Sequence, residues 1–476
     1  MTPARENEPR SSVWFIFAAV VAGLGAAFFL WGSWCAFPDS NWNEMRLAPA
    51  FALRYGITLY PLVGDGPLST WIYGPVGAAI NLPATLADSP AHAIAVAGVI
   101  NSLTLILPFA LICGSDSSHR PPGLALRALV FALCILSLPS LCLIFQVADH
   151  AAAALGLLST WILTRHRSPG TARIGWAAGL CVLAAWSKQT SALLAVAHIL
   201  GLLAMRERGA ALRYAIIVVG LAAATLGVTS ISFGFDNLWL NLVEIPARLP
   251  WGDIGDKLDR RGGDFVIYVV IVPILALATA RYAPPQDPAT ARLLRFALIA
   301  YTVFLPAGLA AFFKIGGDMN SLHAWYFLLP ALVIAWVGYA QNHPARALGP
   351  IIVTTLLLAL RFPYFLSLPS TPANGKIRFA ERFARANPET LWFPYNPVIT
   401  FYSDNKLYHV EDGLATRHLA GLPLREQAFH RSLPSRLTAV IYPVVQTHRF
   451  SLQLIPAFRA RTVLGEWAVF TKIPTP

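Results

Sequence analysis

The sequence predicts a polytopic α-helical membrane protein with about eleven transmembrane helices, an interfacial helix in the first outward loop and a small C-terminal extracytoplasmic α/β domain. Of the 476 residues, 56% are hydrophobic and 13% are charged, with a mean hydropathy of +0.56. A soluble globular domain carries about 25% charged residues. The first apolar run, "SSVWFIFAAVVAGLGAAFFLWGSW", is too long for a signal-peptide core and lacks a clear small-residue cleavage site, so it is interpreted as a retained anchor.

The apolar segments that predict the spans are spread over the first three quarters of the chain, which we assign to a transmembrane domain of residues 1–363. Several are short for a span of roughly 20 residues, so their boundaries are uncertain by a few positions. They lie near 13–34, 91–113, 128–146, 150–164, 174–187, 190–205, 214–233, 265–280, 296–313, 323–340 and 349–363.

The distribution of cations predicts the orientation in the inner (cytoplasmic) membrane. With a cytoplasmic N-terminus, every cytoplasmic connection carries arginine, while the opposite connections are longer in total and hold fewer cations. The excess of 36 Lys and Arg over 24 Asp and Glu is thus a membrane signature, and no nucleic-acid partner is expected. The arginine-rich connections are 1–12, 114–127, 165–173, 206–213, 281–295 and 341–348.

The odd number of spans places residues 364–476 outside the membrane as a second domain. In this tail "GKIRFAERFARAN" predicts a helix, and "NPVITFYS", "KLYHV", "LTAVIYPVV" and "GEWAVFTKI" predict strands. The five cysteines all lie in or at the end of apolar runs, without a CxxC pair, so neither a zinc site nor a disulfide framework is indicated.

The first outward loop contains "FPDSNWNEMRLAPAFALRYGITLYP". Asn41 as an N-cap and Glu44 as the third residue of a capping box predict a helix along the membrane surface, with Arg46 reaching lipid headgroups. This interpretation leaves Asp39 unexplained at the very end of a span. An ionisable side chain at membrane depth is costly, which makes Asp39 a candidate functional residue.

Other charged residues stand alone at the predicted outward ends of spans. Asp149 and His150 lie in "IFQVADHAAAALG", and Lys188 lies in "LAAWSKQTSALL". An acid, a base and a cation at one membrane face are typical of an active site, whereas a transport pathway needs polar residues through the full depth.

Two later connections extend this set. In "GFDNLWLNLVEIPARLPWGDIGDKLDRRGG" two arginines precede paired glycines, which predicts either a mobile phosphate clamp or a solvated charged loop. "KIGGDMNSLHAWYF" offers polar side chains at a span entrance or a plain turn. The candidate substrate-binding residues here are Arg260, Arg261, Lys314, Asn320, His323 and Tyr326.

An acidic residue in an early loop, then "GITLYP", then "WIYGPVGAAINLPA" and a lone Asp at the next outward turn resemble the integral-membrane GT-C glycosyltransferases. The similarity is to the branch with the bacterial relatives of protein mannosyltransferases and aminoarabinose transferases. The resemblance implies hexosyl or pentosyl transfer from a polyprenyl-phosphate-linked sugar to an envelope glycan, lipid or protein at the extracytoplasmic face. It also implies a soluble outward domain, and Tyr73 of the second motif is assigned to substrate binding.

The chemistry implied by this resemblance needs a base for the acceptor hydroxyl and cations for the departing lipid phosphate. By matching position, Asp39 is the candidate general base. Asp149 orients the acceptor, binds a metal or holds Lys188, and Lys188 either meets the phosphate or only pairs with Asp149. His150 and Glu44 are assigned to substrate binding, with capping roles as the alternatives. Many relatives carry an adjacent acidic pair, whereas Asp39 and Glu44 are five positions apart.

No cofactor is assigned, because a divalent metal shared by Asp39 and Asp149 requires them to lie within a few ångströms, which no linear pattern shows. Two other classes of function remain open at this point. A lipid or lipid-glycan transporter needs charges deep within spans, and the runs 214–233 and 349–360 show almost none. A non-catalytic envelope-assembly protein would use Asp39 only as a cap.

Overall fold

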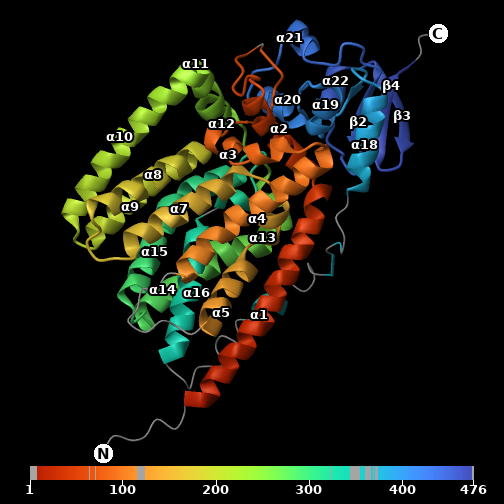
Figure 1. Cartoon of the computed structure of the whole chain (residues 1–476). Coiled ribbons are helices and arrows are strands. Elements are labelled where there is room, and N and C mark those ends of the chain that lie inside the picture. The colour runs from red at the N-terminus through yellow and green to blue at the C-terminus, as the bar shows by residue number, and fades with distance from the viewer. Residues whose placement is uncertain are drawn as a thin grey trace, which may run out of the picture.

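The computed structural model describes residues 8–63, 65–69, 71–114, 124–322, 324–342, 354–359, 366–367, 369 and 374–473. The described chain is mainly helical, with one small sheet near the C-terminus. Figure 1 shows the long helices side by side in a bundle, with the C-terminal region at the end of the bundle opposite the start of α1.

Within the described residues, five helical segments are long and apolar enough to cross a membrane, and the protein is therefore a multi-pass membrane protein. On α1, which forms Glu8–Ala36, the small residues Ala18, Ala22 and Ala26 are buried against the neighbouring helix α5. Small side chains spaced by four let helices approach closely in a membrane. The five segments are Phe15–Asp39, Pro90–Gly114 (α4), Arg208–Phe233 (α10), Ile254–Tyr282 (α13, η5 and α14) and Pro288–Phe313 (α15).

Shorter helices fill the rest of the bundle. Each predicted span that falls on described residues coincides with a helix, but the run 128–146 is broken into α5 and α6, and most of 349–363 lies outside the described residues. The total of about eleven spans stays a prediction. These helices are α5 (Leu124–Ser137), α6 (Ser140–Ile144), α7 (Ala148–Thr164), α8 (Thr171–Ser187), η3 (Gln189–Ala192), α9 (Leu193–Ala204), η6 (Met319–Leu322) and α16 (Trp325–Asn342).

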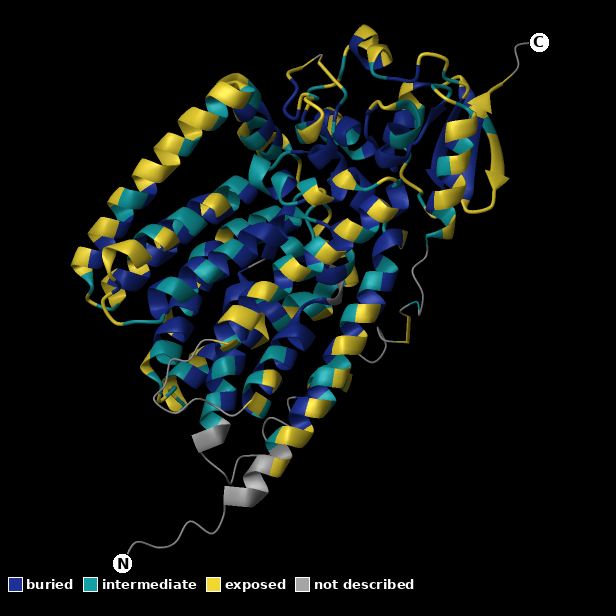
Figure 2. Cartoon of the chain, in the orientation of Figure 1, coloured by how far each residue is buried: buried dark blue, intermediate teal, exposed yellow. Residues whose placement is uncertain are grey.

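Helix α10 shows how the bundle meets lipid. It packs on α8 and α9, while apolar side chains such as Ile216, Val228 and Ile231 stay exposed. Figure 2 shows α10 as largely exposed along its length. In a bilayer such exposure is favourable, because the lipid tails are as apolar as the side chains.

The first outward loop contains α2 (Asn41–Arg54), α3 (Pro75–Ala79) and η2 (Leu82–Leu86). The predicted helix is present, but its N-cap is Ser40 and no side chain caps it, so the predicted capping box is wrong. The carboxyl group of Glu44 instead accepts a hydrogen bond from Asn396, because the C-terminal region covers this face of α2. A position of α2 in the membrane interface stays a prediction.

The long connection after α10 is helical rather than an open loop. It forms α11 (Phe235–Trp239), η4 (Leu240–Glu244), α12 (Ile245–Arg248) and α13 (Ile254–Phe265). The paired glycines that follow Arg261 lie inside α13, which continues into η5 (Val266–Ile271) and α14 (Val272–Tyr282). The paired glycines therefore do not interrupt the helix, and a phosphate-clamp role of Arg260 and Arg261 stays a prediction.

The C-terminal region is an α/β unit around a four-stranded sheet in the order β1-β2-β4-β3. The predicted helix and the strands in "LTAVIYPVV" and "GEWAVFTKI" are confirmed as α18, β2 and β4, whereas "NPVITFYS" forms helix α19 and "KLYHV" has no regular structure. The elements are α18 (Gly375–Ala386), β1 (Leu391–Trp392), α19 (Pro397–Asp404), α20 (Glu411–Leu419), α21 (Glu426–Arg431), β2 (Ala439–Pro443), α22 (Phe450–Leu454), β3 (Phe458–Leu464) and β4 (Trp467–Lys472).

The C-terminal region shares a hydrophobic core with the first outward loop. The ring of Phe401 on α19 lies 4.9 Å from Phe51 and 4.7 Å from Tyr55, between ring centroids. Ile377 of α18 belongs to the same buried cluster as Leu59 of the loop. The proposed boundary at residue 364 lies outside the described residues and stays a prediction.

Candidate active site

Asp149 is the centre of a buried polar cluster at the end of the bundle. Helices α7 and α8 are consecutive and pack together, so the start of α7 and the end of α8 lie side by side. Lys188 follows directly after α8, and its ammonium group forms an ion pair with Oδ1 of Asp149. Asn320, on η6, donates to Oδ2 at 3.0 Å. With 1% of its side chain exposed, Asp149 is a carboxylate whose two oxygens are both engaged.

Arg46 on α2 joins this cluster. Its guanidinium carbon lies 5.5 Å from the centre of the Tyr73 ring, and Nη2 lies 3.5 Å from Oδ2 of Asp412 on α20. Burial alone would lower the pKa of Arg46, but Tyr73, Asp412 and Asp149 outweigh burial and raise it. Arg46 is thus held as a cation next to the buried Asp149.

The "YGP" segment places Tyr73 between the two cations. The hydroxyl of Tyr60 donates to the backbone carbonyl of Tyr73 at 2.7 Å, and Nζ of Lys188 lies 5.9 Å from the Tyr73 ring centre. At Gly74 an added Cβ would stand 1.8 Å from the carbonyl oxygen of Trp186. Only glycine allows the loop to approach the end of α8 this closely.

These residues form what we call the Asp149 cluster. Two cations and two carboxylates bring its formal charge to zero in the described structure, and a phenol and an amide supply further hydrogen-bonding groups. Cations of this kind bind a phosphate group, Arg by a two-pronged contact and Lys as a point charge. The members are Arg46, Tyr73, Asp149, Lys188, Asn320 and Asp412.

Asp39 lies in a second group, which we call the Asp39 cluster and which consists of Asp39, Glu44, Lys376 and Asn396. Asp39 is exposed at the end of η1 (Phe37–Asp39), where Nζ of Lys376 lies 3.0 Å from its carboxylate and 2.9 Å from its backbone oxygen. Asp39 is thus tied to α18 of the C-terminal region.

Glu44 is the buried member of the Asp39 cluster. Oε1 accepts from Nδ2 of Asn396 at 2.7 Å, and Oε2 is buried with no hydrogen-bond partner among the described residues. Burial raises the pKa of Glu44 to about 7, although Asn396 and Lys376 lower it. The C-terminal region covers the carboxyl group of Glu44 in this structure, and its substrate-binding role stays a prediction.

His150 and Tyr326 pack against α4 instead of joining Asp149. Nδ1 of His150 is 2.8 Å from Oδ1 of Asn101, and the hydroxyl of Tyr326 donates to the carbonyl of Leu105 at 2.5 Å. Both side chains are buried. Tyr326 lies in the first turn of α16, as expected for a span entrance, with its ring against Phe109 of α4; its substrate-binding role stays a prediction.

The two arginines of α13 have different surroundings. Arg260 is exposed and pairs with Asp256 one helical turn away. Arg261 donates from Nε and Nη2 to the two oxygens of Asp318, each at 2.9 Å. Asp318 immediately precedes η6, the element that carries Asn320. Arg261 therefore supports the Asp149 cluster from outside it, whereas Arg260 does not contact it.

Lys314 has a structural contact. Its Nζ donates to the carbonyls of Pro246 at 2.7 Å and Ala247 at 3.0 Å, which closes α12 onto the end of α15. Lys257, which the sequence interpretation overlooked, is likewise buried and donates to backbone carbonyls, including that of Gly317 at 2.8 Å. The predicted residue His323 lies outside the described residues.

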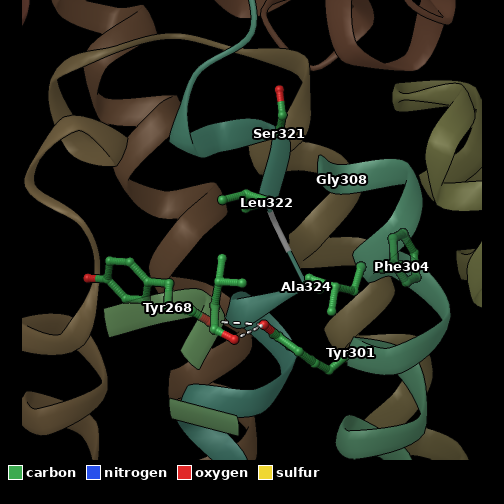
Figure 3. Close-up of a pocket in the computed structure, with 9 residues that line it drawn as sticks. Tyr268, Tyr301, Phe304, Gly308, Ser321, Leu322 and Ala324 are labelled. Atoms are coloured by element: carbon green, nitrogen blue, oxygen red, sulfur yellow. Dashed lines mark hydrogen bonds between the residues drawn. The ribbon is translucent and has the colours of Figure 1, made fainter. Parts of the chain in front are cut away.

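A small cavity lies inside the bundle behind η6. Its lining includes Tyr268, Tyr301, Gly308 and Ser321. Figure 3 shows the hydroxyl of Tyr301 directed at the backbone carbonyls of residues 268 and 269, both at 3.1 Å. Its lining is mainly apolar and contains none of the residues of the Asp149 cluster, so this cavity is not where the cations meet.

The described residues contain no group of three or more His, Cys, Asp or Glu side chains close enough to hold a metal ion. Asp39 pairs with Lys376, and Asp149 pairs with Lys188. In this structure each carboxylate thus has a cation of the chain as its partner.

The fold defines a multi-pass membrane protein with a buried cluster of two cations and two carboxylates at one end of its bundle. Residues 71–307 match the model of glycosyltransferase family 87. The matched range is just under half of the chain and includes Tyr73, Asp149 and Lys188. The chain is a membrane glycosyltransferase of the GT-C superfamily, which confirms the resemblance noted in its sequence motifs.

Among solved structures, the chain is similar to the archaeal oligosaccharyltransferase AglB from Archaeoglobus fulgidus, solved in complex with an inhibitory peptide and a dolichol-phosphate. The TM-score is 0.47 and the sequence identity 11%, over 97% of this chain and 74% of that chain. No curated protein matches the sequence.

Proposed function

We propose that the protein transfers a sugar from a polyprenyl-phosphate-linked donor to an envelope glycan, lipid or protein at the extracytoplasmic face of the inner membrane. The observation that carries this proposal is the position of two cations, Arg46 and Lys188, in the Asp149 cluster at one end of the bundle. Two cations on the same buried cluster are suited to the phosphate of a lipid-linked sugar.

The departing group in this reaction is the lipid phosphate. The acceptor oxygen forms a bond to the anomeric carbon while the bond from that carbon to the phosphate oxygen breaks, and the phosphate keeps the electron pair. Arg46 and Lys188 stabilise the charge that develops on it, and Asp149 positions both cations. Tyr73 lies between the cations and is proposed to contact the donor.

The proton of the acceptor hydroxyl goes to a carboxylate, for which we propose Asp39. Asp39 is exposed and therefore accessible to an acceptor from outside the bundle, whereas both oxygens of Asp149 are already engaged. The base and one of the cations are carried by one segment, because Asp39 lies two residues before the start of α2 and Arg46 lies in its second turn.

The extracytoplasmic orientation is supported by the arginines of the predicted cytoplasmic connections. The start of α1 lies at the end of the bundle opposite the C-terminal region in Figure 1. A cytoplasmic N-terminus would therefore place both clusters and the C-terminal region on the outside.

The test is the envelope glycan and glycolipid profile, by mass spectrometry, of a deletion strain complemented with wild type, Asp39→Asn or Asp149→Asn. We expect one sugar mass to disappear in the deletion strain, to return with wild type, and not to return with either variant. Asp88→Asn is the matched control, because Asp88 is an exposed carboxylate whose ion pair is with the neighbouring, exposed His92.

Each outcome requires normal amounts of the variant in the membrane, measured by immunoblot. A profile unchanged by the deletion would overturn the enzymatic assignment in this envelope. Full restoration by Asp39→Asn, with loss in Asp149→Asn, would keep the transferase and remove Asp39 as the base.

A further inference from the structure

Helix α20 of the C-terminal region is held firmly on the first outward loop. The backbone N–H of Val410 donates to the carbonyl of Leu68 at 2.9 Å, and the N–H of Leu68 donates to Nδ1 of His409 at 3.0 Å. An added Cβ at Gly413 would stand 2.8 Å from the same carbonyl of Leu68. This close approach sets the position of the first turn of α20 relative to the loop.

The first turn of α20 carries two acids with different roles. Glu411 is buried and accepts hydrogen bonds from Ser451 and from Tyr442, so it holds the C-terminal region together. Asp412 instead faces the bundle, with Oδ2 at 3.5 Å from Nη2 of Arg46. The C-terminal region thus contributes a carboxylate to a cluster whose other members come from the helical bundle and its loops.

The two carboxylates near Arg46, those of Asp149 and Asp412, differ in exposure and in the length of their contacts. Asp149 is 1% exposed and bound by Lys188 and Asn320, so removing it from its partners would leave a buried charge. The side chain of Asp412 is 21% exposed, and its contact with Arg46 is long for an ion pair. Of the two, Asp412 is the more exposed and makes the longer contact, so it is the one that an incoming anion reaches.

The charges around Arg46 also favour the displacement of Asp412 by a phosphate. Among the printed contacts, Lys188 pairs with Asp149 and Arg46 pairs with Asp412. A lipid phosphate adds at least one negative charge, and a phosphate monoester carries about −1.5 to −2 at pH 7. Because like charges repel, a phosphate on Arg46 is unfavourable while the Asp412 carboxylate stays next to it.

We propose that Asp412 occupies, in the donor-free protein, the position on Arg46 that the donor phosphate takes, and that it therefore competes with the donor. This inference rests on the proposed function, because it identifies Arg46 as a phosphate ligand. Binding moves the Asp412 side chain away, while the backbone bonds to Leu68 keep α20 in place. The C-terminal region in this way sets the affinity of the membrane site for its lipid phosphate.

The experiment measures binding of farnesyl phosphate, a short polyprenyl monophosphate, to the purified full-length protein in detergent. Asp412→Asn is expected to lower the Kd about threefold to tenfold, since it removes one competing charge at a partly exposed position. Asp412→Glu, which keeps the charge, is expected to stay within about twofold of wild type. In an Arg46→Gln background, Asp412→Asn is expected to change the Kd by less than about twofold, because the shared partner is gone.

Glu426→Gln is the matched control, because its side chain is 90% exposed on α21 and its removal changes the net charge equally. Farnesol, which lacks the phosphate, should bind wild type and Asp412→Asn alike. An unchanged or higher Kd of a folded Asp412→Asn protein for farnesyl phosphate would overturn the competition. If wild type does not bind farnesyl phosphate in preference to farnesol, both this inference and the lipid-phosphate donor fail.

Discussion

The Asp149 cluster and the Asp39 cluster both depend on α2 but present opposite chemistry. Glu44 and Arg46 are two residues apart, about 200° around a helix, so they point to different sides of α2. On one side Arg46 contacts Tyr73 and Asp412 and lies within the electrostatic influence of the buried Asp149. On the other side Glu44 is buried under α19 beside the exposed Asp39.

This difference matches two tasks of the proposed glycosyl transfer. The Asp149 cluster holds cations in a buried place, where their attraction for a phosphate is strong. The Asp39 cluster offers a carboxylate that water and an acceptor can reach. A helix that carries both tasks links the binding of the donor to the position of the proposed base.

The largest difference between the two clusters is expected in enzyme kinetics. Asp39→Asn should lower kcat about 10²- to 10⁴-fold with little change in the KM for the donor, because a base acts only on the reacting proton. Asp149→Asn should raise the donor KM as well, because Lys188 loses its partner. The measurement is steady-state kinetics of the purified enzyme with a polyprenyl-phosphate sugar. Equal effects of both variants on KM would show that the two clusters do not divide the tasks.

The next largest difference between the clusters is expected in the free energy of unfolding. Lys188→Met leaves Asp149 buried without its cation and should cost about 3–5 kcal/mol of unfolding free energy. The double variant Lys188→Met/Asp149→Leu should recover most of this loss while staying inactive. Unfolding in mixed detergent micelles measures both. A loss below about 1 kcal/mol in the single variant would mean that solvent reaches the pair.

The Asp39 cluster should make stability depend on pH through Glu44. Its pKa is about 7 in the folded protein and 4.5 for the model side chain, so the folded state binds the proton more tightly. The resulting stabilisation is fully present below pH 4.5 and is lost as the pH rises through about 7. The loss should be on the order of 3 kcal/mol between these limits.

Glu44→Gln should flatten this dependence, since glutamine does not titrate. Thermal unfolding at pH 5 and pH 8 measures the effect, with the exposed Glu426→Gln as the control that keeps the wild-type slope. An unchanged slope in Glu44→Gln would assign the dependence to another group.

The smallest effects are expected at α13, outside both clusters. Arg260→Gln should change the unfolding free energy by no more than about 0.5 kcal/mol, because its pair with Asp256 is exposed. Arg261→Gln should cost about 1 kcal/mol, since its two-pronged contact with Asp318 is partly shielded. It should also raise the donor KM modestly through Asn320. Equal behaviour of the two variants would remove the link from α13 to the Asp149 cluster.

The sequence pattern was sufficient to predict those elements whose environment depends on neighbouring residues along the chain. The apolar runs predicted the positions of the helices, and alternation predicted β2 and β4. The pattern misled at "NPVITFYS", where Pro397 at the first helical turn and burial of Val398 and Ile399 favour α19 over a strand. Propensity is a weak prior that packing overrides.

A sequence feature could have identified Arg46 as a site residue, but the sequence analysis assigned Arg46 to lipid headgroups. It is one of the few cations on the predicted outward side, the same property that singled out Lys188. Asp412 carried no comparable signal, because it lies among ordinary charged residues of the tail, and 366 positions separate it from Arg46.

The sequence by itself determined that the chain enters a membrane and that Asp39, Asp149 and Lys188 stand at the ends of spans. Hydrophobicity and charge can be summed over short windows, so these properties need no partner elsewhere in the chain. Only the tertiary structure decided that Lys188 and Asn320 hold Asp149, that Asp39 pairs with Lys376, and that Asp412 reaches Arg46. Such pairs depend on distances of a few ångströms between residues far apart in sequence, which helix packing alone sets.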